Sequence, residues 1–286
     1  MSRQLDPFDR LKARYCIAAM GLAWFLPGST MVLDMLPDAE SYWSDLILQY
    51  IAHAVMALFI VAAIWWAKID PKALLGRRPK GADLWPVVKL DVFLFSISNV
   101  ITTVIFLPVS FLLPSFMQWW LQWINQPSIY LDAEGHWPIA ANALSLLSLI
   151  VLAPVTEEIF FRGFLLHRFT RKWGSLIGIL ASSALFGALH PDTLEAGVFG
   201  VAMCLLYMHT RSLYVPMCAH GLYNLAVWLF EAYDALTKGV DYYQYDLDQF
   251  YSDCWMAPIY ALIALLIVDS YVRRSTLKIP KRLPAV

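Results

Sequence analysis

The stretch LIVLAPVTEEIFFR, residues 149–162, joins an apolar run to two adjacent glutamates and an arginine. An ionised side chain at the centre of a membrane helix costs about 2.5–3.5 kcal/mol on insertion scales, so such residues are rare and commonly functional. The surrounding chain is strongly apolar, since 59% of its 286 residues are hydrophobic and only 15% are charged. Soluble domains contain about 25% charged residues. We therefore interpret the chain as a membrane protein in which these carboxylates carry out chemistry.

Apolar segments recur along the whole chain and approach the roughly 20 residues that a helix needs to cross a hydrocarbon core. The first of them shows no convincing cleavage site, which predicts a retained anchor helix and not a signal peptide. We expect an all-α, polytopic fold of about eight transmembrane helices, within a single membrane domain that covers residues 1–286. The segments lie near residues 15–36, 46–67, 90–113, 138–160, 174–190, 194–210, 213–233 and 255–272.

The distribution of charge supports this topology and excludes some partners. With eight crossings and both termini in the cytosol, every lysine and arginine except Lys238 falls on the inner side, Arg162 included, as the positive-inside rule predicts. A net charge of -1 provides no basic face for phosphates, so no nucleic-acid partner is expected. The four cysteines form no Cys-x-x-Cys pair, which argues against a disulfide framework or a thiolate zinc site.

Two stretches on the predicted outer side are rich in aromatic residues. Residues 114–137 contain several tryptophans and predict a short amphipathic helix along the membrane interface, where aromatic rings prefer to lie. Residues 234–253 contain several tyrosines and are predicted to form a similar outer loop. An ordinary aromatic belt explains both stretches, and nothing in the sequence supports a substrate-gating role.

Helical spacing separates the roles of the two glutamates. Glu158 and Arg162 are four residues apart with the carboxylate nearer the N-terminus, which is the favourable order for an ion pair. Glu157 points about 100° away and is freer to face a cavity. Pro154, about one turn earlier, can open the backbone hydrogen-bond ladder or bend the helix. The alternative is a purely structural ion pair near the cytosolic end of the helix.

Two further polar sites follow on apolar segments. The run Phe186-Gly187-Ala188-Leu189-His190 ends one segment, and His220-Gly221-Leu222-Tyr223-Asn224 places an imidazole and a carboxamide on one helix face. A lone histidine at a helix end is commonly a cap, and a polar pair in a membrane either joins helices or serves a reaction. His53 is expected to be a helix–helix hydrogen-bond partner. The three sites together favour a reaction.

The ordered motifs Glu157-Glu158-x-x-x-Arg162, Phe186-x-x-x-His190 and His220-x-x-x-Asn224 resemble the CAAX protease and bacteriocin-processing (CPBP) family of intramembrane endopeptidases. This family includes the type II endopeptidase that trims prenylated proteins. The resemblance places a catalytic core at residues 138–234. It implies an all-α membrane hydrolase that cleaves a peptide bond with an activated water.

The resemblance also implies roles for the motif residues. Glu157 would be the general base, and His190 would assist proton transfer or position the water. His220 and Asn224 would form the oxyanion site, where a donor is worth about 3–4 kcal/mol. Glu158 and Arg162 would hold Glu157 in place, and Phe186 would be a further supporting residue.

Other interpretations stay open at this point. No cofactor is favoured, but Glu157, His190 and His220 also match the ligand types of a hydrolytic zinc site, which makes an intramembrane zinc metalloprotease the first alternative. A non-catalytic immunity or scaffold protein, or a transporter, is a second alternative. Inverted-repeat carriers show paired Gly/Pro-interrupted helices, and no such pair is found here.

The expected partners are the lipid bilayer and a membrane-associated or lipidated peptide or protein substrate. A multi-pass location in the cell membrane is expected, with the bacterial inner membrane favoured over the endoplasmic reticulum membrane of a eukaryote. At 1.5 Å per residue, Glu157 and His220 lie near mid-membrane, whereas His190 lies higher on a straight helix. A tilted or later-starting helix would bring His190 within about 8 Å of Glu157, which joint catalysis requires.

Overall fold

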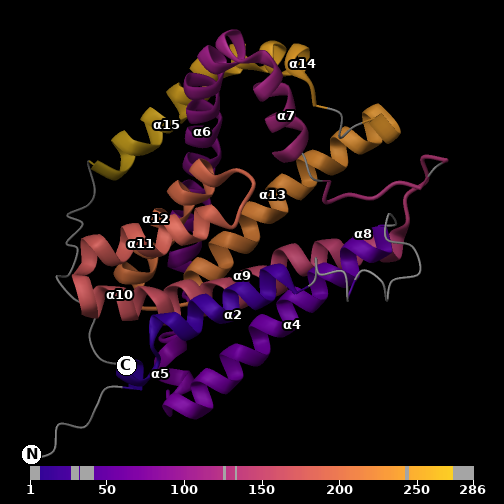
Figure 1. Cartoon of the computed structure of the whole chain (residues 1–286). Coiled ribbons are helices and arrows are strands. Elements are labelled where there is room, and N and C mark those ends of the chain that lie inside the picture. Colours follow the sequence, from indigo (N-terminus) through magenta and orange to yellow (C-terminus); the bar gives the residue numbers. More distant parts are fainter. Residues whose placement is uncertain are drawn as a thin grey trace, which may run out of the picture.

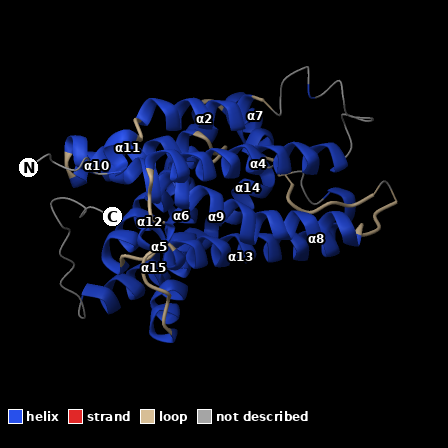
Figure 2. Cartoon of the chain, turned by 90° about the horizontal axis from the view of Figure 1, so that it is seen from below, coloured by secondary structure: helices blue, strands red, loops and turns tan. Residues whose placement is uncertain are grey.

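The computed structural model describes residues 7–26, 32, 42–124, 127–132, 134–241 and 245–272. Within these ranges all regular elements are helices, and the one extended pairing is an isolated bridge between Gly76 and Ser212 (Figure 2). The predicted all-α class is therefore confirmed for the described part. The helices before residue 139 are α1 (Pro7–Arg10), α2 (Ala13–Phe25), α4 (Tyr42–Ala67), α5 (Pro71–Leu75), α6 (Gly81–Leu112) and α7 (Pro114–Ile124).

The second half of the chain continues as helices. The elements from residue 139 onward are α8 (Ile139–Leu147), η1 (Ser148–Leu152), α9 (Ala153–Glu158), η2 (Ile159–Leu165), α10 (Leu166–Trp173), α11 (Ser175–Ala188), α12 (Thr193–Thr210), α13 (Tyr214–Lys238), η3 (Gly239–Asp241), α14 (Leu247–Asp253), η4 (Cys254–Met256) and α15 (Ala257–Val272). The end of the first predicted segment and both chain termini lie outside the described residues, so the cytosolic termini stay a prediction.

Among the described residues, five helical stretches are long and apolar enough to cross a membrane. They are Tyr42–Ala67, Asp83–Leu112, Ile139–Trp173, Thr193–Thr210 and Leu247–Ser270. Two shorter apolar helices, Ala13–Ala23 and Ser175–Ala188, accompany them. The chain is thus a multi-pass membrane protein. The count of eight crossings stays a prediction, because α13, which carries His220, Asn224 and Glu231, is not among these stretches.

One continuous helical rod, from Ile139 to Trp173, carries the glutamates. The apolar segment predicted near residues 138–160 is the first part of this longer helix, because no described residue breaks the helix before Gly174, whose φ is +86°. Two wide π-helical stretches, η1 and η2, interrupt the rod on either side of α9. Such stretches shift the helical register and are frequent at functional sites. The rod therefore presents Glu157 and Glu158 between two local distortions.

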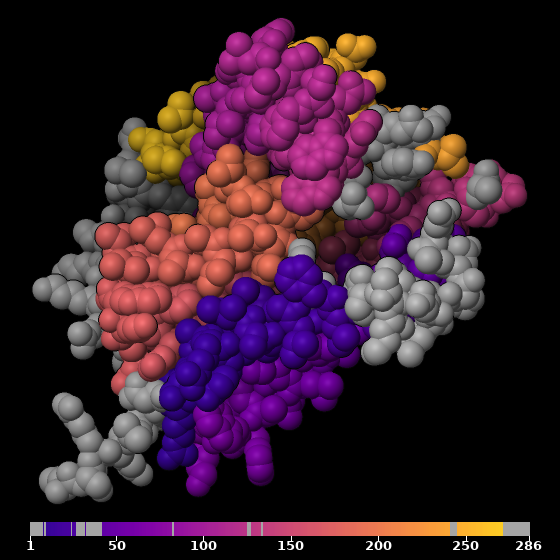
Figure 3. All heavy atoms as spheres, in the orientation of Figure 1, coloured from indigo at the N-terminus to yellow at the C-terminus, as the bar shows by residue number. Residues whose placement is uncertain are grey.

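The helices form two groups that meet at α13 (Figure 1). One group contains α6, α7, α14 and α15, and the other contains α2, α4 and the rod from α8 to α10. Helices α11 and α12 pack closely together and lie beside α10. In the space-filling view, α2 lies along the same side of the molecule as α4, which it contacts (Figure 3).

A short polar clamp joins the beginnings of α6 and α13. The Leu213 backbone N–H donates to the Leu75 carbonyl at 2.9 Å, and the Ser212 hydroxyl donates to the Arg77 carbonyl at 2.6 Å. Gly76 fits here because its φ is +72° and because a Cβ atom would lie 2.2 Å from the Arg211 carbonyl oxygen. We call these contacts the basal clamp. It fixes the starting points of the two helices relative to each other.

The core is built around η2. Phe160, Phe161 and Phe164 are fully buried and belong to one apolar cluster that also takes in residues of α4, α6, α11, α12 and α13. Large apolar side chains such as Trp65 and Leu265 are exposed on the outside. In a bilayer this outer surface faces lipid, so the driving force for helix association comes from packing and polar contacts.

One of the two aromatic-rich stretches is helical as predicted, and the other contains more helix than predicted. Residues 114–124 form α7, which confirms the short helix, although its position at an interface is untested. The stretch 234–253 is not simply a loop, because α13 continues to Lys238 and α14 begins at Leu247. Asp246 caps α14 by accepting from the Gln249 backbone N–H at 2.9 Å, which explains why a helix begins there.

Candidate active site

The adjacent glutamates at the end of α9 have different surroundings. The side chain of Glu157 is 21% exposed, whereas that of Glu158 is completely buried. Their directions differ as the helical spacing predicts. Glu157 has one carboxylate oxygen, Oε2, that is buried without a hydrogen-bond partner. Oε2 of Glu158 is likewise buried without a partner, so the feature that distinguishes Glu157 is its partial exposure.

Glu158 is held by two cationic or ionisable partners. Arg162 donates from Nη1 to Glu158 Oε1 at 2.8 Å, which confirms the predicted ion pair. The same oxygen lies 3.0 Å from Nδ1 of His220 on α13. Arg162 also donates to the Gly200 carbonyl on α12 at 3.2 Å, and its guanidinium lies 4.6 Å from the centre of the Phe186 ring. This cluster ties α9 and η2 to α11, α12 and α13.

One expectation about this cluster needs correction. The Arg162 side chain is buried in the core, where Glu158 and the Phe186 ring offset the cost of burying its charge, and its place on the inner side stays a prediction. Glu158 was expected to hold Glu157, but its hydrogen bonds go to Arg162 and His220. Glu158 therefore orients the histidine and not its neighbouring glutamate.

His190 reaches the site from the end of α11. Its backbone N–H donates to Gly187, and its ring Nδ1 lies 2.7 Å from the Phe186 carbonyl. The His190 ring stacks on the Phe186 ring with 4.4 Å between centroids, so Phe186 holds it by both contacts. His190 Nε2 lies 4.0 Å from Glu157 Oε2, well inside the expected limit of about 8 Å. The two residues meet because the chain turns back at Gly174 and α11 packs along α10. Glu157 lies 17 residues before this turn (174 − 157) and His190 lies 16 residues after it (190 − 174), so they reach the same level.

Pro154 and Gly221 bring α13 close to the rod. Pro154 has no backbone N–H, so the carbonyls one turn earlier are available to other donors. Asn224 uses this opening and donates from Nδ2 to the Leu149 carbonyl at 2.8 Å. A Cβ atom at Gly221 would lie only 2.7 Å from the Ile150 carbonyl oxygen, so glycine permits this approach. The result places His220 and Asn224 beside α9, as their spacing on one helix face predicts.

The two histidines converge on one oxygen of Glu157. Nε2 of His220 lies 4.0 Å from Glu157 Oε2, the same distance as Nε2 of His190. A carbonyl oxygen only accepts, so His190 carries its proton on Nδ1 when neutral, and Glu158 favours the same tautomer in His220. Both Nε2 atoms are then acceptors directed towards a carboxylate oxygen. A water molecule at this point would donate its two hydrogens to two of these three acceptors.

Some neighbours of the site were not identified from the sequence. The Phe199 ring packs 5.0 Å from the His220 ring, edge to face, and then contacts Tyr223. His53 of α4 lies 3.3 Å from the hydroxyl of Thr156, the residue before Glu157, so it is a helix–helix partner as expected, and it also lies next to the site. Aromatic and threonine residues are common in apolar helices, so no sequence pattern marks Phe199 or Thr156 as a neighbour of the site.

Whether a group of side chains can hold a metal ion depends on the distances between their potential ligand atoms. Within the described part of the chain, one group of potential ligands has all its donor atoms within 4.8 Å of one another: Asp132, Glu134 and His136. The Asp132 carboxylate there already accepts hydrogen bonds from the His136 ring and from the backbone N–H groups of Glu134 and His136. These hydrogen bonds, that of the His136 backbone first, lower the pKa of Asp132. The set Glu157, His190 and His220 has the donor types of a zinc site but a wider spacing.

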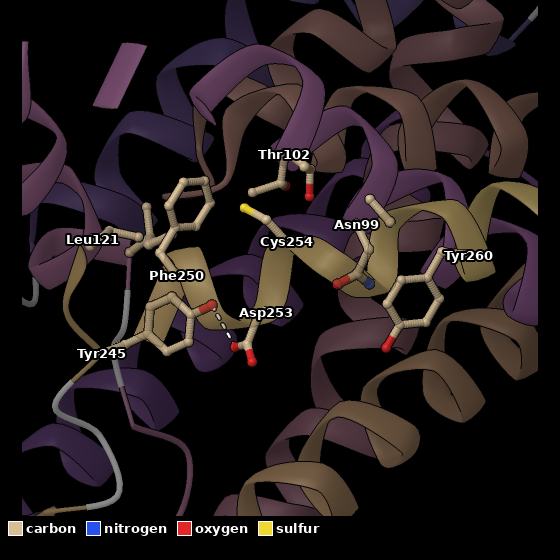
Figure 4. A pocket seen from close by; sticks show the side chains of 11 residues that line it. Asn99, Thr102, Leu121, Tyr245, Phe250, Asp253, Cys254 and Tyr260 are labelled. Carbon is tan, nitrogen blue, oxygen red and sulfur yellow. Dashed lines mark hydrogen bonds between the residues drawn. The ribbon is translucent and has the colours of Figure 1, made fainter. Parts of the chain in front are cut away.

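A separate cavity lies between α6, α7, α14 and α15 (Figure 4). Its volume is about 280 Å³, and Asn99, Thr102, Asp253 and Tyr260 are among its lining residues. The Tyr245 hydroxyl donates to Asp253 at 2.7 Å at one side of it. None of the three motifs lines this cavity.

Comparison with known proteins identifies the segment that carries the three motifs. The family model described as Type II CAAX prenyl endopeptidase Rce1-like matches residues 139–226. The "Putative membrane peptidase YdiL" of Bacillus subtilis (strain 168) is 29% identical over 92 residues, which are 31% of this chain and 38% of that protein. The match thus spans less than two thirds of that relative. No solved structure matches the chain. The resemblance to the CAAX endopeptidases is confirmed for this segment.

Proposed function

We propose that the chain is an intramembrane endopeptidase that hydrolyses a peptide bond with a water activated by Glu157. The observation that carries the proposal is the convergence of His190 Nε2 and His220 Nε2 on Glu157 Oε2, at 4.0 Å each, from three separate helices. The similarity of residues 139–226 to the CAAX prenyl endopeptidases supports a protease as the reaction class.

Glu157 acts as the general base in this mechanism. Its Oε2 takes a proton from the water while the water oxygen bonds to the carbonyl carbon of the peptide. Collapse of the tetrahedral intermediate breaks the C–N bond, and the amine leaves with the proton returned through Glu157 or His190. General acid–base catalysis of this kind contributes about 10²–10⁴-fold.

His220 and Asn224 stabilise the negative oxygen of the intermediate. Asn224 uses one amide hydrogen for the Leu149 carbonyl and retains a second one. His220 donates from Nε2 only as the doubly protonated ring, and Glu158 is the carboxylate at its other nitrogen. Glu158 and Arg162 are thus positioning residues that act through His220.

The substrate is a membrane-associated or lipidated peptide or protein, because the site lies among helices that cross the bilayer. The enzyme is then a multi-pass protein of a cell membrane, with a bacterial inner membrane favoured.

Zinc is the second candidate for activating the water. The donor types fit, because two imidazole Nε2 atoms and one carboxylate oxygen converge, and because Glu158 sits behind His220 as carboxylates sit behind metal-bound histidines. Glu157, His190 and His220 would hold the ion, which would supply a water of lowered pKa. The wide donor spacing favours the metal-free form.

Replacement of the proposed base tests the function. Cells that produce the intact protein and cells that produce Glu157→Gln are compared by quantitative mass spectrometry of membrane-protein termini. We expect defined cleavage products to disappear or fall by about 10²–10⁴-fold, while the amount of inserted protein is unchanged. Glu134→Gln, in an exposed loop, is the matched control and should leave the products intact.

Two other results would redirect the proposal. If Glu157→Gln and the intact protein give identical termini, the chain is a scaffold or a carrier and not a protease. If exhaustive chelation abolishes cleavage and added zinc restores it, the glutamate-only mechanism is wrong and the zinc mechanism replaces it.

A further inference from the structure

Asp91, in the middle of α6, is a buried carboxylic acid without a partner. Its exposure is only 9%, and neither carboxylate oxygen has a hydrogen-bond partner. Buried polar groups are nearly always paired, and an ionisable residue inside a membrane helix is costly unless it serves a function. Asp91 therefore calls for a partner that the chain itself does not supply.

The position of Asp91 on α6 directs it to the interior. Val87, Leu94 and Ser98 are four, three and seven residues away, so they share its helix face. Val87 and Leu94 belong to the same buried cluster as Phe199 and Ala219 of the site region. Asp91 thus faces α12 and α13 and not lipid.

Tyr223 connects this face to the proposed active site. It packs against the buried cluster that contains Val87 and Leu94. Phe95, one turn after Asp91 on α6, stacks on Phe230 of α13 with 5.2 Å between ring centroids, so this face of α6 packs against α13. Tyr223 follows His220 by three residues on α13, and the Phe199 ring contacts both of their rings. Asp91 on α6 therefore lies beside the turn of α13 that carries His220.

Helix geometry gives a similar height for the two residues. The basal clamp fixes the beginnings of α6 and α13 together. At 1.5 Å per residue, Asp91 lies about 15 Å along α6 from Gly81, and Tyr223 lies about 14 Å along α13 from Tyr214. The two positions match within one helix turn.

The other acids near Tyr223 differ from Asp91. Glu195 accepts a hydrogen bond from the Thr102 hydroxyl at 2.5 Å, and Asp192 is exposed before α12. Both carboxylates lie on or just before α12, whose Phe199 ring contacts the Tyr223 ring. The surroundings are thus negative, and Asp91 is the member whose two oxygens are both buried and unpaired.

We propose that Asp91 is a specificity-determining residue that binds a positively charged side chain of the substrate, lysine or arginine, within a few residues of the scissile bond. A cationic side chain would pair with both free oxygens and remove the cost of the isolated acid. The negative surroundings reinforce this preference, because they penalise an acidic side chain at the same place. The inference rests on the proposed protease function and adds a requirement on substrate sequence.

The test uses substrates recovered from the comparison of intact and Glu157→Gln cells. Each position within four residues of the cleavage site is changed in turn to lysine or to methionine in a purified single-span peptide, reconstituted with the enzyme in phospholipid vesicles. We expect one position at which intact enzyme prefers lysine, and a fall of this lysine/methionine ratio of kcat/KM by at least roughly 30-fold in Asp91→Asn.

Two control variants keep the test specific. Asp91→Glu keeps the charge and should retain the lysine preference, whereas Asp45→Asn on α4 should leave the ratio unchanged. Cleavage of the methionine peptide reports that Asp91→Asn is folded.

The outcomes separate this inference from the proposed function. If Glu157→Gln abolishes cleavage but no position prefers lysine or arginine, or if Asp91→Asn keeps the preference, Asp91 is a structural acid and the inference is overturned alone. If Glu157→Gln does not abolish cleavage, the proposed function itself fails.

Discussion

The end of α9 and the middle of α6 each bury a carboxylate, yet the two regions treat it in opposite ways. Glu158 is fully buried and shares its charge with Arg162 at 2.8 Å and His220 at 3.0 Å. Asp91 is almost as buried, and neither of its oxygens has a partner. In the first region the charges of Glu158 and Arg162 are paired within the chain, although Glu158 Oε2 and Arg162 Nε have no hydrogen-bond partner. The second is complete only with a ligand or with a proton on the acid.

This difference separates the structural role of Glu158 from the substrate-binding role proposed for Asp91. A paired buried charge fixes the geometry of its neighbours, and the loss of one partner leaves the other charge uncompensated. An unpaired acid makes no hydrogen bond that positions its neighbours. Its replacement by a neutral residue of similar shape should therefore change the free energy of unfolding of the substrate-free protein only slightly. Stability measurements on the two regions should therefore diverge.

The largest effect is expected at Glu158. Glu158→Gln leaves the buried Arg162 charge without its carboxylate and should lower the free energy of unfolding by about 3–5 kcal/mol. Thermal unfolding of purified protein in detergent measures the change. The double variant Glu158→Gln/Arg162→Met removes both charges and should recover most of this loss, but not the cleavage activity, because His220 loses its orienting oxygen. Equal stability of the single and double variants would contradict the pairing.

An intermediate effect is expected where α13 approaches the rod. Gly221→Ala would place a Cβ atom 2.7 Å from the Ile150 carbonyl, so it should destabilise by about 1–3 kcal/mol and displace His220. Gly197→Ala on α12 is the matched control, since its Cβ would meet nothing within 4 Å. A similar melting temperature for both variants would show that the close approach is not needed.

The smallest effect is expected at Asp91. Asp91→Asn should change the free energy of unfolding by less than about 0.5 kcal/mol in protein without substrate, since it breaks no described hydrogen bond. The same unfolding assay measures it beside the Glu158 variants. A loss comparable with that of Glu158→Gln would reveal a structural partner and would remove the contrast between the two regions.

Local spacing was sufficient to predict the main features of the rod. The four-residue interval predicted the ion pair of Glu158 and Arg162, and the 100° step separated Glu157 from it, because both follow from helix geometry alone. The all-α class followed from the long apolar segments.

Contacts between distant segments were beyond the sequence. The direction of His220 towards Glu158 depends on how closely α13 approaches the rod, which Gly221 and the missing N–H of Pro154 permit only once the helices have met. The reach of His190 depends on the continuation of the rod to Trp173 and the reversal at Gly174, which the segment bounds drawn from the apolar pattern missed. The isolation of Asp91 is likewise visible only when all its neighbours are known.

The basal clamp between residues 75–77 and 210–213 has a mechanical consequence. Because the clamp holds α6 and α13 together at one end, any separation between them must be a rotation about the clamp, and the distance between the helices would increase away from it. In such a rotation the residues near the clamp would move least, and His220 is among them. The far ends of the two helices would separate most, whereas the catalytic residues would keep their spacing.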